Sequence, residues 1–325
     1  MRNLTDSPRA AFGGTRSLFI TVGFFSFFVN LLMLTGPLYM LQVYDRVLSS
    51  GSEATLLALT VLIAALYGIM GVLDYARGRI AARLGALFQT RLDAKVFEAG
   101  LSRALTSGER GRPWSGLRDL EAVQRFMASP VLFALFDMPW TPIFIAAIFM
   151  FHPWLGWLAV GGLIVLVMVS LLNQLMTRRS NAEANATAMV SDSFAETVRQ
   201  QSEVVQGLGM RGAVLARWQM NRKRALSANI ASADVVNQFT TMSKTVRFFL
   251  QSVMLGLGAY IVLQGEMTAG AMIAGSILLG RALAPVEQVI GGWGLAARAR
   301  QGWKHLQGFL EATPEEEALT ALPVS

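Results

Sequence analysis

The sequence predicts an all-helical membrane protein with six transmembrane helices, and three features of its composition and charge pattern support this prediction. Hydrophobic residues make up 53% of the chain and charged residues 15%, whereas roughly one quarter of the residues in soluble domains are charged. Six uncharged or nearly uncharged stretches divide the chain, and each has about the 20 residues that a bilayer requires. Of the 28 Lys and Arg residues, 27 lie near the chain ends or in the long gaps that follow the second and fourth stretches. Only Arg46 lies on the other side. Such asymmetry is typical of a multi-pass protein whose long loops and both termini lie in the cytoplasm.

The six predicted spans follow one another as three pairs. They are expected at residues 18–43, 54–75, 131–151, 154–177, 246–264 and 267–290. The first pair is a hairpin with an extracytoplasmic turn at Ser49–Glu53, and Pro37 predicts a kink in its first helix. The turn His152-Pro153 joins the third span to the fourth. The sixth span contains the charged residue Arg281.

Two long cytoplasmic excursions separate the three pairs. Apolar residues recur at helical spacing over 76–105 without a proline, so the second span is predicted to continue as a helix beyond the bilayer. A return helix is predicted over 117–127. The second excursion repeats this plan, with helices over 178–206 and 213–247 on either side of a glycine-containing break at 207–212.

Few residues of this chain are suited to chemistry. The absence of cysteine excludes disulfides, thiolate metal sites and thiol catalysis. The two histidines, His152 and His305, lie far apart without further ligand residues, so no metal site is expected. No serine or carboxylate pair has the context of a nucleophile and base, so we expect neither catalysis nor a bound cofactor. The net charge of +7 suits helical surfaces that face anionic lipid, and no nucleic-acid partner is expected.

Four separated motifs cover most of the chain. They are Leu117-Arg118-Asp119-Leu120-Glu121, then Phe136 to Phe144 with His152 to Gly156, then Glu203 to Met210 with Arg217-Trp218, and finally Gly280 to Gln288. In this order they resemble the transmembrane domain of type I secretion ABC transporters. The resemblance implies an ABC exporter fold over 18–310, a cytoplasmic tail at 1–17, and a linker at 311–325 that leads toward a nucleotide-binding domain.

The sequence departs from this family in one major way. It contains neither the phosphate-binding motif G-x-x-x-x-G-K-[ST] nor an LSGGQ-like signature. We therefore expect a membrane domain without ATPase activity of its own, whose ATPase domain is fused further along or supplied separately. The resemblance implies that ATP and Mg²⁺ bind in that other domain. Because about seventeen residues precede the first predicted span, we expect no peptidase-like domain before it. The resemblance then points to the PrtD-like subgroup that exports unprocessed proteases and lipases.

The tips of the two excursions are candidate contact sites. The resemblance implies that they are coupling helices that dock on nucleotide-binding domains. The candidate contacts are Trp114, Leu117 and Leu120 in the first excursion, and Leu208, Gly209, Met210 and Arg211 in the second. A simpler interpretation of Gly207, Gly209 and Gly212 is an ordinary turn.

Three charges and one set of small residues within the predicted spans are further candidates. An ionisable group inside an apolar span is costly unless it is paired or faces water. Asp137, Arg281 and Glu287 are therefore candidates to line the translocation pathway or to pair between spans, although Asp137 also lies where it can cap or anchor the third span. Small residues at four-residue spacing allow helices to approach closely. Those of the sixth span, which we expect to pack near a dimer axis, are Gly275, Ser276, Gly280 and Ala284.

The resemblance implies a homodimer in the bacterial inner membrane that exports an unfolded polypeptide. The implied partners, beside membrane lipid and a second copy, are a nucleotide-binding domain, a periplasmic adaptor and a TolC-like outer-membrane channel. Two alternatives stay open. One is an ABC exporter of lipids or small molecules, against which only the span motifs argue. The other is a membrane-embedded enzyme, which would need clustered His, Asp or Arg at an interface, and the sequence lacks such a cluster.

Overall fold

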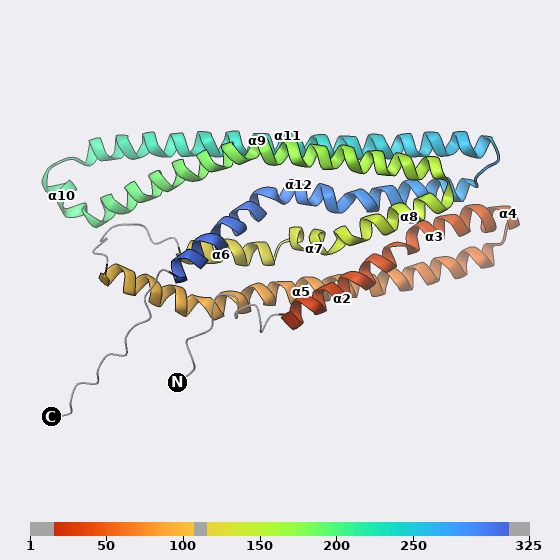
Figure 1. The fold of residues 1–325 in the computed structure, drawn as a ribbon, viewed down its shortest axis with the longest axis horizontal. Helices are drawn as coiled ribbons and strands as arrows, with labels where there is room; N and C mark the ends of the chain where they lie inside the picture. Colours follow the sequence, from red (N-terminus) through yellow and green to blue (C-terminus); the bar gives the residue numbers. More distant parts are fainter. Residues whose placement is uncertain (1–15, 107–115, 312–325) are drawn as a thin grey trace, which may run out of the picture.

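The protein is built from long helices that run roughly along one axis (Figure 1). A computed structural model describes residues 16–106 and 116–311. Six helical segments in these residues are long and apolar enough to cross a membrane, which confirms the all-helical, six-span prediction. We call the end that carries residues 51–52, 152 and 264–268 the hairpin end, and the end that carries residues 201–210 the arm end.

The helices differ greatly in length. In chain order they are α2 (Arg16–Met33), α3 (Thr35–Gln42), α4 (Leu48–Ser50), α5 (Glu53–Thr106), α6 (Gly116–Met127), α7 (Pro130–Asp137), α8 (Thr141–Phe151), α9 (Pro153–Gln200), α10 (Ser202–Gly207), α11 (Arg211–Leu263) and α12 (Ala269–Glu311). Helices α5, α9, α11 and α12 have 54, 48, 53 and 43 residues, whereas about 20 suffice to cross a bilayer. The predicted continuation of the second span beyond the bilayer is therefore confirmed.

The first span is interrupted one turn before Pro37. Helix α2 ends at Met33, and α3 begins at Thr35 with Pro37 in its first turn. The N–H groups of a first helical turn have no partner inside the helix, so a proline is tolerated there. A π-helical turn at Val43–Val47 and the short α4 complete this segment. The chain then reverses at Gly51, whose φ of 62° is a left-handed conformation that suits glycine.

The third span is interrupted. Helix α7 ends at Asp137, a 3-10 turn covers Met138–Trp140, and α8 begins at Thr141. Pro139 lies within this turn, and proline lacks the N–H that a continuous helix would use. The interruption places Asp137 at a helix end that faces α2 and α5.

The tip of the second excursion contains a separate short helix. The predicted helix over 178–206 ends at Gln200, and α10 covers Ser202–Gly207 before α11 begins at Arg211. Of the three glycines assigned to this break, only Gly209 has a positive φ, at 67°. The other two glycines adopt helical geometry, so Gly209 alone requires a glycine for the turn.

Three apolar clusters hold the described helices together, and the smallest joins α7 to α12. The largest joins α8, α9, α11 and α12, with Phe144, Leu155 and Met254 almost fully buried in it. The second joins α5, α6 and α12 toward the arm end, and its members are Phe88, Leu92, Val96, Leu120, Val123, Met127 and Leu306. Close contact between α6 and α12 depends on Gly302, because a Cβ there would lie 2.8 Å from the backbone oxygen of Asp119.

Candidate functional site

Asp137 forms a buried ion pair that ties together three spans. Its side chain accepts a hydrogen bond at Oδ1 from Arg77 Nη1 of α5 at 3.1 Å, and another from Asn30 Nδ2 of α2 at 2.6 Å. Arg77 and Asp137 are only 6% and 9% exposed. A buried charge is tolerated when it is paired and hydrogen-bonded. The structure therefore places Asp137 between spans, away from any open surface of this protomer.

The guanidinium of Arg77 has further partners. It contacts Asp74 Oδ1 at 2.7 Å and donates to Ser26 Oγ at 3.1 Å. Its Cζ lies 4.5 Å from the ring centroid of Phe133, within the range of a cation–π contact. Sequence reasoning did not identify Arg77 as the partner of Asp137. The available signal was its position just after the uncharged part of the second span, but periodicity does not reveal a partner 60 residues away.

The two charges of the sixth span have different surroundings. Glu287 is paired, because Arg247 Nε of α11 lies 2.5 Å from its Oε2 and both side chains are largely buried. Arg281 is exposed, and it forms no ion pair within residues 16–106 and 116–311. Both residues line a cavity of about 580 Å³ between α11 and α12, together with Gln251 and Gly280. Of the three charged candidates Asp137, Arg281 and Glu287, Arg281 is thus the one whose side chain remains accessible.

The candidate coupling residues fall into two groups. At the tip of the second excursion, Leu208 and Met210 are 67% and 47% exposed, and they belong to none of the apolar clusters that the described residues form. In the first excursion, Leu120 is fully buried between α5 and α12. It belongs to the core, so the docking role expected of it is not retained. Leu117 packs on the edge of the same cluster, and Trp114 lies outside the described residues.

The small residues of the sixth span pack inside the protomer. Gly275 and Ser276 are buried, and a Cβ on Gly275 would meet Leu155 of α9 at 3.7 Å. Gly280 faces the side chain of Gln251 on α11. Within the protomer, Gly275 therefore approaches α9 and Gly280 approaches α11. Ala284, which is half-buried, lines the cavity beside Arg281.

At the hairpin end, a carboxylate caps the start of α12. Asp45 accepts hydrogen bonds from the backbone N–H of Gly270 at 3.0 Å and from Thr268 Oγ1 at 2.6 Å. A carboxylate here satisfies backbone donors and favours the positive end of the helix dipole. Nearby, His152 Nε2 lies 3.1 Å from Glu266 Oε2, which links the α8–α9 turn to the α11–α12 turn. Sequence reasoning had not assigned Asp45 a role.

The described residues do not contain a group suited to bind a metal. No set of three or more His, Cys, Asp or Glu side chains comes together in the parts of the chain that the structure covers. Among the ionisable groups that do meet, the pairs Arg77–Asp137 and Arg247–Glu287 join different helices.

Comparison with known proteins gives a consistent result. Residues 19–284 match the family described as the ABC transporter transmembrane region. The type I secretion system ATP-binding protein PrsD of Rhizobium meliloti (strain 1021) is 37% identical over 316 residues, which cover 97% of this chain and 54% of that protein. The toxin RTX-I translocation ATP-binding protein of Actinobacillus pleuropneumoniae is 25% identical over 285 residues, which cover 86% of this chain and 40% of that protein. The chain thus spans about half or less of the length of these relatives.

The fold also matches a solved structure. A bacterial Atm1-family ABC exporter with ATP bound superimposes with a TM-score of 0.76 at 15% sequence identity. The match covers 92% of this chain and 54% of that one. At this identity the likeness concerns the fold, which is that of an ABC exporter transmembrane domain.

Proposed function

Because this chain belongs to the ABC transporter transmembrane family, we propose that it is the membrane half of a type I secretion exporter and forms the pathway for an unfolded polypeptide. The observation that carries the proposal is the 37% identity to PrsD over nearly the whole chain. The relatives whose names describe toxin and leukotoxin translocation support the same substrate class.

Two copies of the chain form the complete pathway in this proposal. The most apolar window of α5 has none of its residues buried within the protomer, so this helix has a free face for lipid or for a second copy. Arg281 is the span charge that we assign to the pathway, because it is exposed and unpaired among the described residues. Asp137 and Glu287 are instead held by Arg77 and Arg247.

The arm end is assigned to the cytoplasm of a bacterial cell, and the membrane to its inner membrane. The Lys and Arg residues concentrate in the two excursions and near the ends of the chain, and such residues favour the cytoplasmic side. Both termini then lie in the cytoplasm. A periplasmic adaptor and a TolC-like channel would continue the pathway from the hairpin end.

Energy is supplied by a nucleotide-binding domain that binds ATP and Mg²⁺ and contacts the tip around α10. The exposed Leu208 and Met210 form the apolar part of the contact, and Gly209 and Arg211 flank it. Helices α9 and α11 transmit the movement because they pack along each other and are linked by the hydrogen bond from Ser232 to Asn181. A displacement at the tip therefore reaches the membrane through two continuous helices.

The proposal can be tested by replacing the matching part of PrsD with residues 1–325 in Rhizobium meliloti cells that lack PrsD. We expect the proteins that this system secretes to return to the culture medium. A chimera with its phosphate-loop lysine changed to alanine is the control and should restore nothing. A membrane-inserted chimera whose ATPase responds to lipids or small molecules, but which secretes no protein, would contradict the proposal and favour the alternative exporter class.

A further inference from the structure

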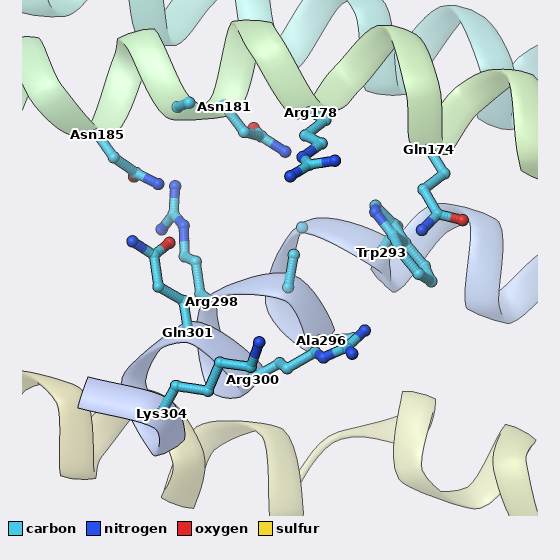
Figure 2. A pocket seen from close by; sticks show the side chains of 13 residues that line it. Gln174, Arg178, Asn181, Asn185, Trp293, Ala296, Arg298, Arg300, Gln301 and Lys304 are labelled. Carbon is cyan, nitrogen blue, oxygen red and sulfur yellow. The ribbon is translucent and has the colours of Figure 1, made fainter. Parts of the chain in front are cut away.

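A second cavity, between α9 and α12, was not anticipated from the sequence (Figure 2). Its volume is about 580 Å³. The residues that line it are Gln174, Arg178, Asn181, Ala182 and Asn185 of α9, with Trp293, Gly294, Ala296, Ala297, Arg298, Arg300, Gln301 and Lys304 of α12. We call this cavity the basic pocket.

The charge of the basic pocket is positive and uncompensated. Its lining includes Arg178, Arg298, Arg300 and Lys304 but no Asp or Glu. Within the part of the chain that the structure describes, none of these four cations forms an ion pair. Figure 2 shows Arg178 extending from α9 and Arg298 from α12 into the space between the helices. Like charges that converge on one cavity raise the local potential and attract an anion.

The basic pocket lies at the depth of lipid headgroups. At 1.5 Å per residue, Arg178 is about 37 Å along α9, and Trp293 is about 36 Å along α12, from their starts at the hairpin end. A hydrocarbon core is about 30 Å thick, and the headgroup regions extend the bilayer to about 40–45 Å. Tryptophan is enriched at this boundary. By the same measure Arg298 is about 44 Å along α12, so Arg178 and Arg298 lie beyond the thickness of the hydrocarbon and within that of the headgroup region, whereas Lys304, at about 52 Å, lies farther toward the arm end.

An apolar stripe on α9 leads from the membrane into the basic pocket. Ile164, Val167 and Leu171 are 56%, 42% and 55% exposed. With Gln174 and Arg178 they follow a spacing of three and four residues, which places all five on one helix face. This face changes from aliphatic to polar and basic where the helix leaves the hydrocarbon.

We propose that the basic pocket binds the phosphate headgroup of an anionic phospholipid, with an acyl chain lying along Ile164, Val167 and Leu171. The pairing of a phosphate with arginine is a strong, charge-assisted interaction. An extended peptide would leave its backbone polar groups unpaired against the aliphatic stripe, which is costly. A free phosphate would use the cations but not the stripe. An amphiphile matches both parts.

The test measures lipid binding to the purified 325-residue chain. Native mass spectrometry would quantify retention of phosphatidylglycerol and phosphatidylcholine added to the detergent-solubilised protein. We expect phosphatidylglycerol to bind and phosphatidylcholine not to bind. The double variant Arg178→Gln/Arg298→Gln should bind phosphatidylglycerol about tenfold or more weakly, because each cation near a membrane surface contributes to anionic lipid attraction. Arg179→Gln, adjacent but outside the lining, is the matched control and should change binding less than about twofold.

Further variants and ligands distinguish lipid binding from the binding of other anions. Leu171→Ser should weaken phosphatidylglycerol binding without changing any binding of inorganic phosphate. Arg178→Lys/Arg298→Lys keeps the charge and should retain most of the binding, and unchanged tryptophan-fluorescence melting would exclude misfolding of each variant. The proposal is overturned if Arg179→Gln weakens binding as much as the double variant, if Leu171→Ser has no effect, or if an acidic peptide binds in place of the lipid. The outcome does not depend on whether the chain exports a polypeptide.

Discussion

Breaking the Arg77–Asp137 pair from one side should destabilise the protein more than removing both partners. In Arg77→Met, the carboxylate of Asp137 keeps only the hydrogen bond from Asn30, with its side chain 13% exposed. In Asp137→Leu, Arg77 keeps Asp74 at 2.7 Å and the ring of Phe133. The charge that remains in Arg77→Met therefore has fewer partners than the charge that remains in Asp137→Leu. Arg77→Met should lower the free energy of unfolding more.

The magnitudes follow from the burial of the pair. Removing one partner of a buried ion pair costs about 3–5 kcal/mol, because the other charge is left uncompensated. We expect Arg77→Met near the upper value and Asp137→Leu near the lower. The double variant Arg77→Met/Asp137→Leu should cost about 1–2 kcal/mol, since apolar replacement of a whole buried pair is often near neutral. Asn30 retains its bond to the backbone oxygen of Ser26 at 2.8 Å in every variant.

The assay is the free energy of unfolding from SDS titration of the purified protein, followed by helical circular dichroism. The control is Arg125→Gln, which breaks an exposed pair with Glu121 and should cost less than about 1 kcal/mol. If each single variant costs no more than this control, or if the double variant costs the sum of the singles, the pair does not act as an inter-span lock and the reasoning fails.

Three further predictions concern packing, topology and coupling. Gly302→Ala should lower the free energy of unfolding, because its Cβ would lie 2.8 Å from the backbone oxygen of Asp119. Gly308 has open space around it, so Gly308→Ala should leave the free energy of unfolding unchanged or raise it by about 0.5–1 kcal/mol. Equal effects of the two variants would contradict the close packing of α6 on α12. In intact cells, an impermeant thiol reagent should label Arg46→Cys but not Arg211→Cys, in a chain without native cysteine, and the reverse pattern would refute the orientation. In a transporter completed with its ATPase domain, Met210→Asp should abolish export while the protein still inserts and hydrolyses some ATP; normal export would remove the docking role.

The sequence predicted the spans and helices because their signals are local. An uncharged stretch of about 20 residues and a helical apolar period are visible in any short window. The pairing of Arg77 with Asp137 and the capping of α12 by Asp45 join residues 60 and 225 positions apart. Such contacts depend on how the helices pack in space, which a short window of sequence does not reveal.

The candidate site was predictable only in part, for the same reason. The turn at the tip required only the glycines of one segment, and exposed apolar residues were expected beside it. The burial of Leu120 depends on Phe88 and Leu306, which approach it from two other helices. The basic pocket likewise needs Arg178 and Arg298 on separate helices. Its residues looked like ordinary membrane-border charges until the fold brought them together.

The most direct measurement of the central claim is contact between this chain and a polypeptide in transit. A photo-crosslinking amino acid at Arg281, in the chimera with the ATPase part of PrsD, would be activated while a cargo fused to a fast-folding domain is stalled in the exporter. We predict a crosslink between cargo and chain that requires ATP and disappears in the phosphate-loop variant. The control position is Leu263, at the end of α11 and 87% exposed. Crosslinks from Arg281 to lipid alone, with stalled cargo present, would contradict a polypeptide pathway through this domain.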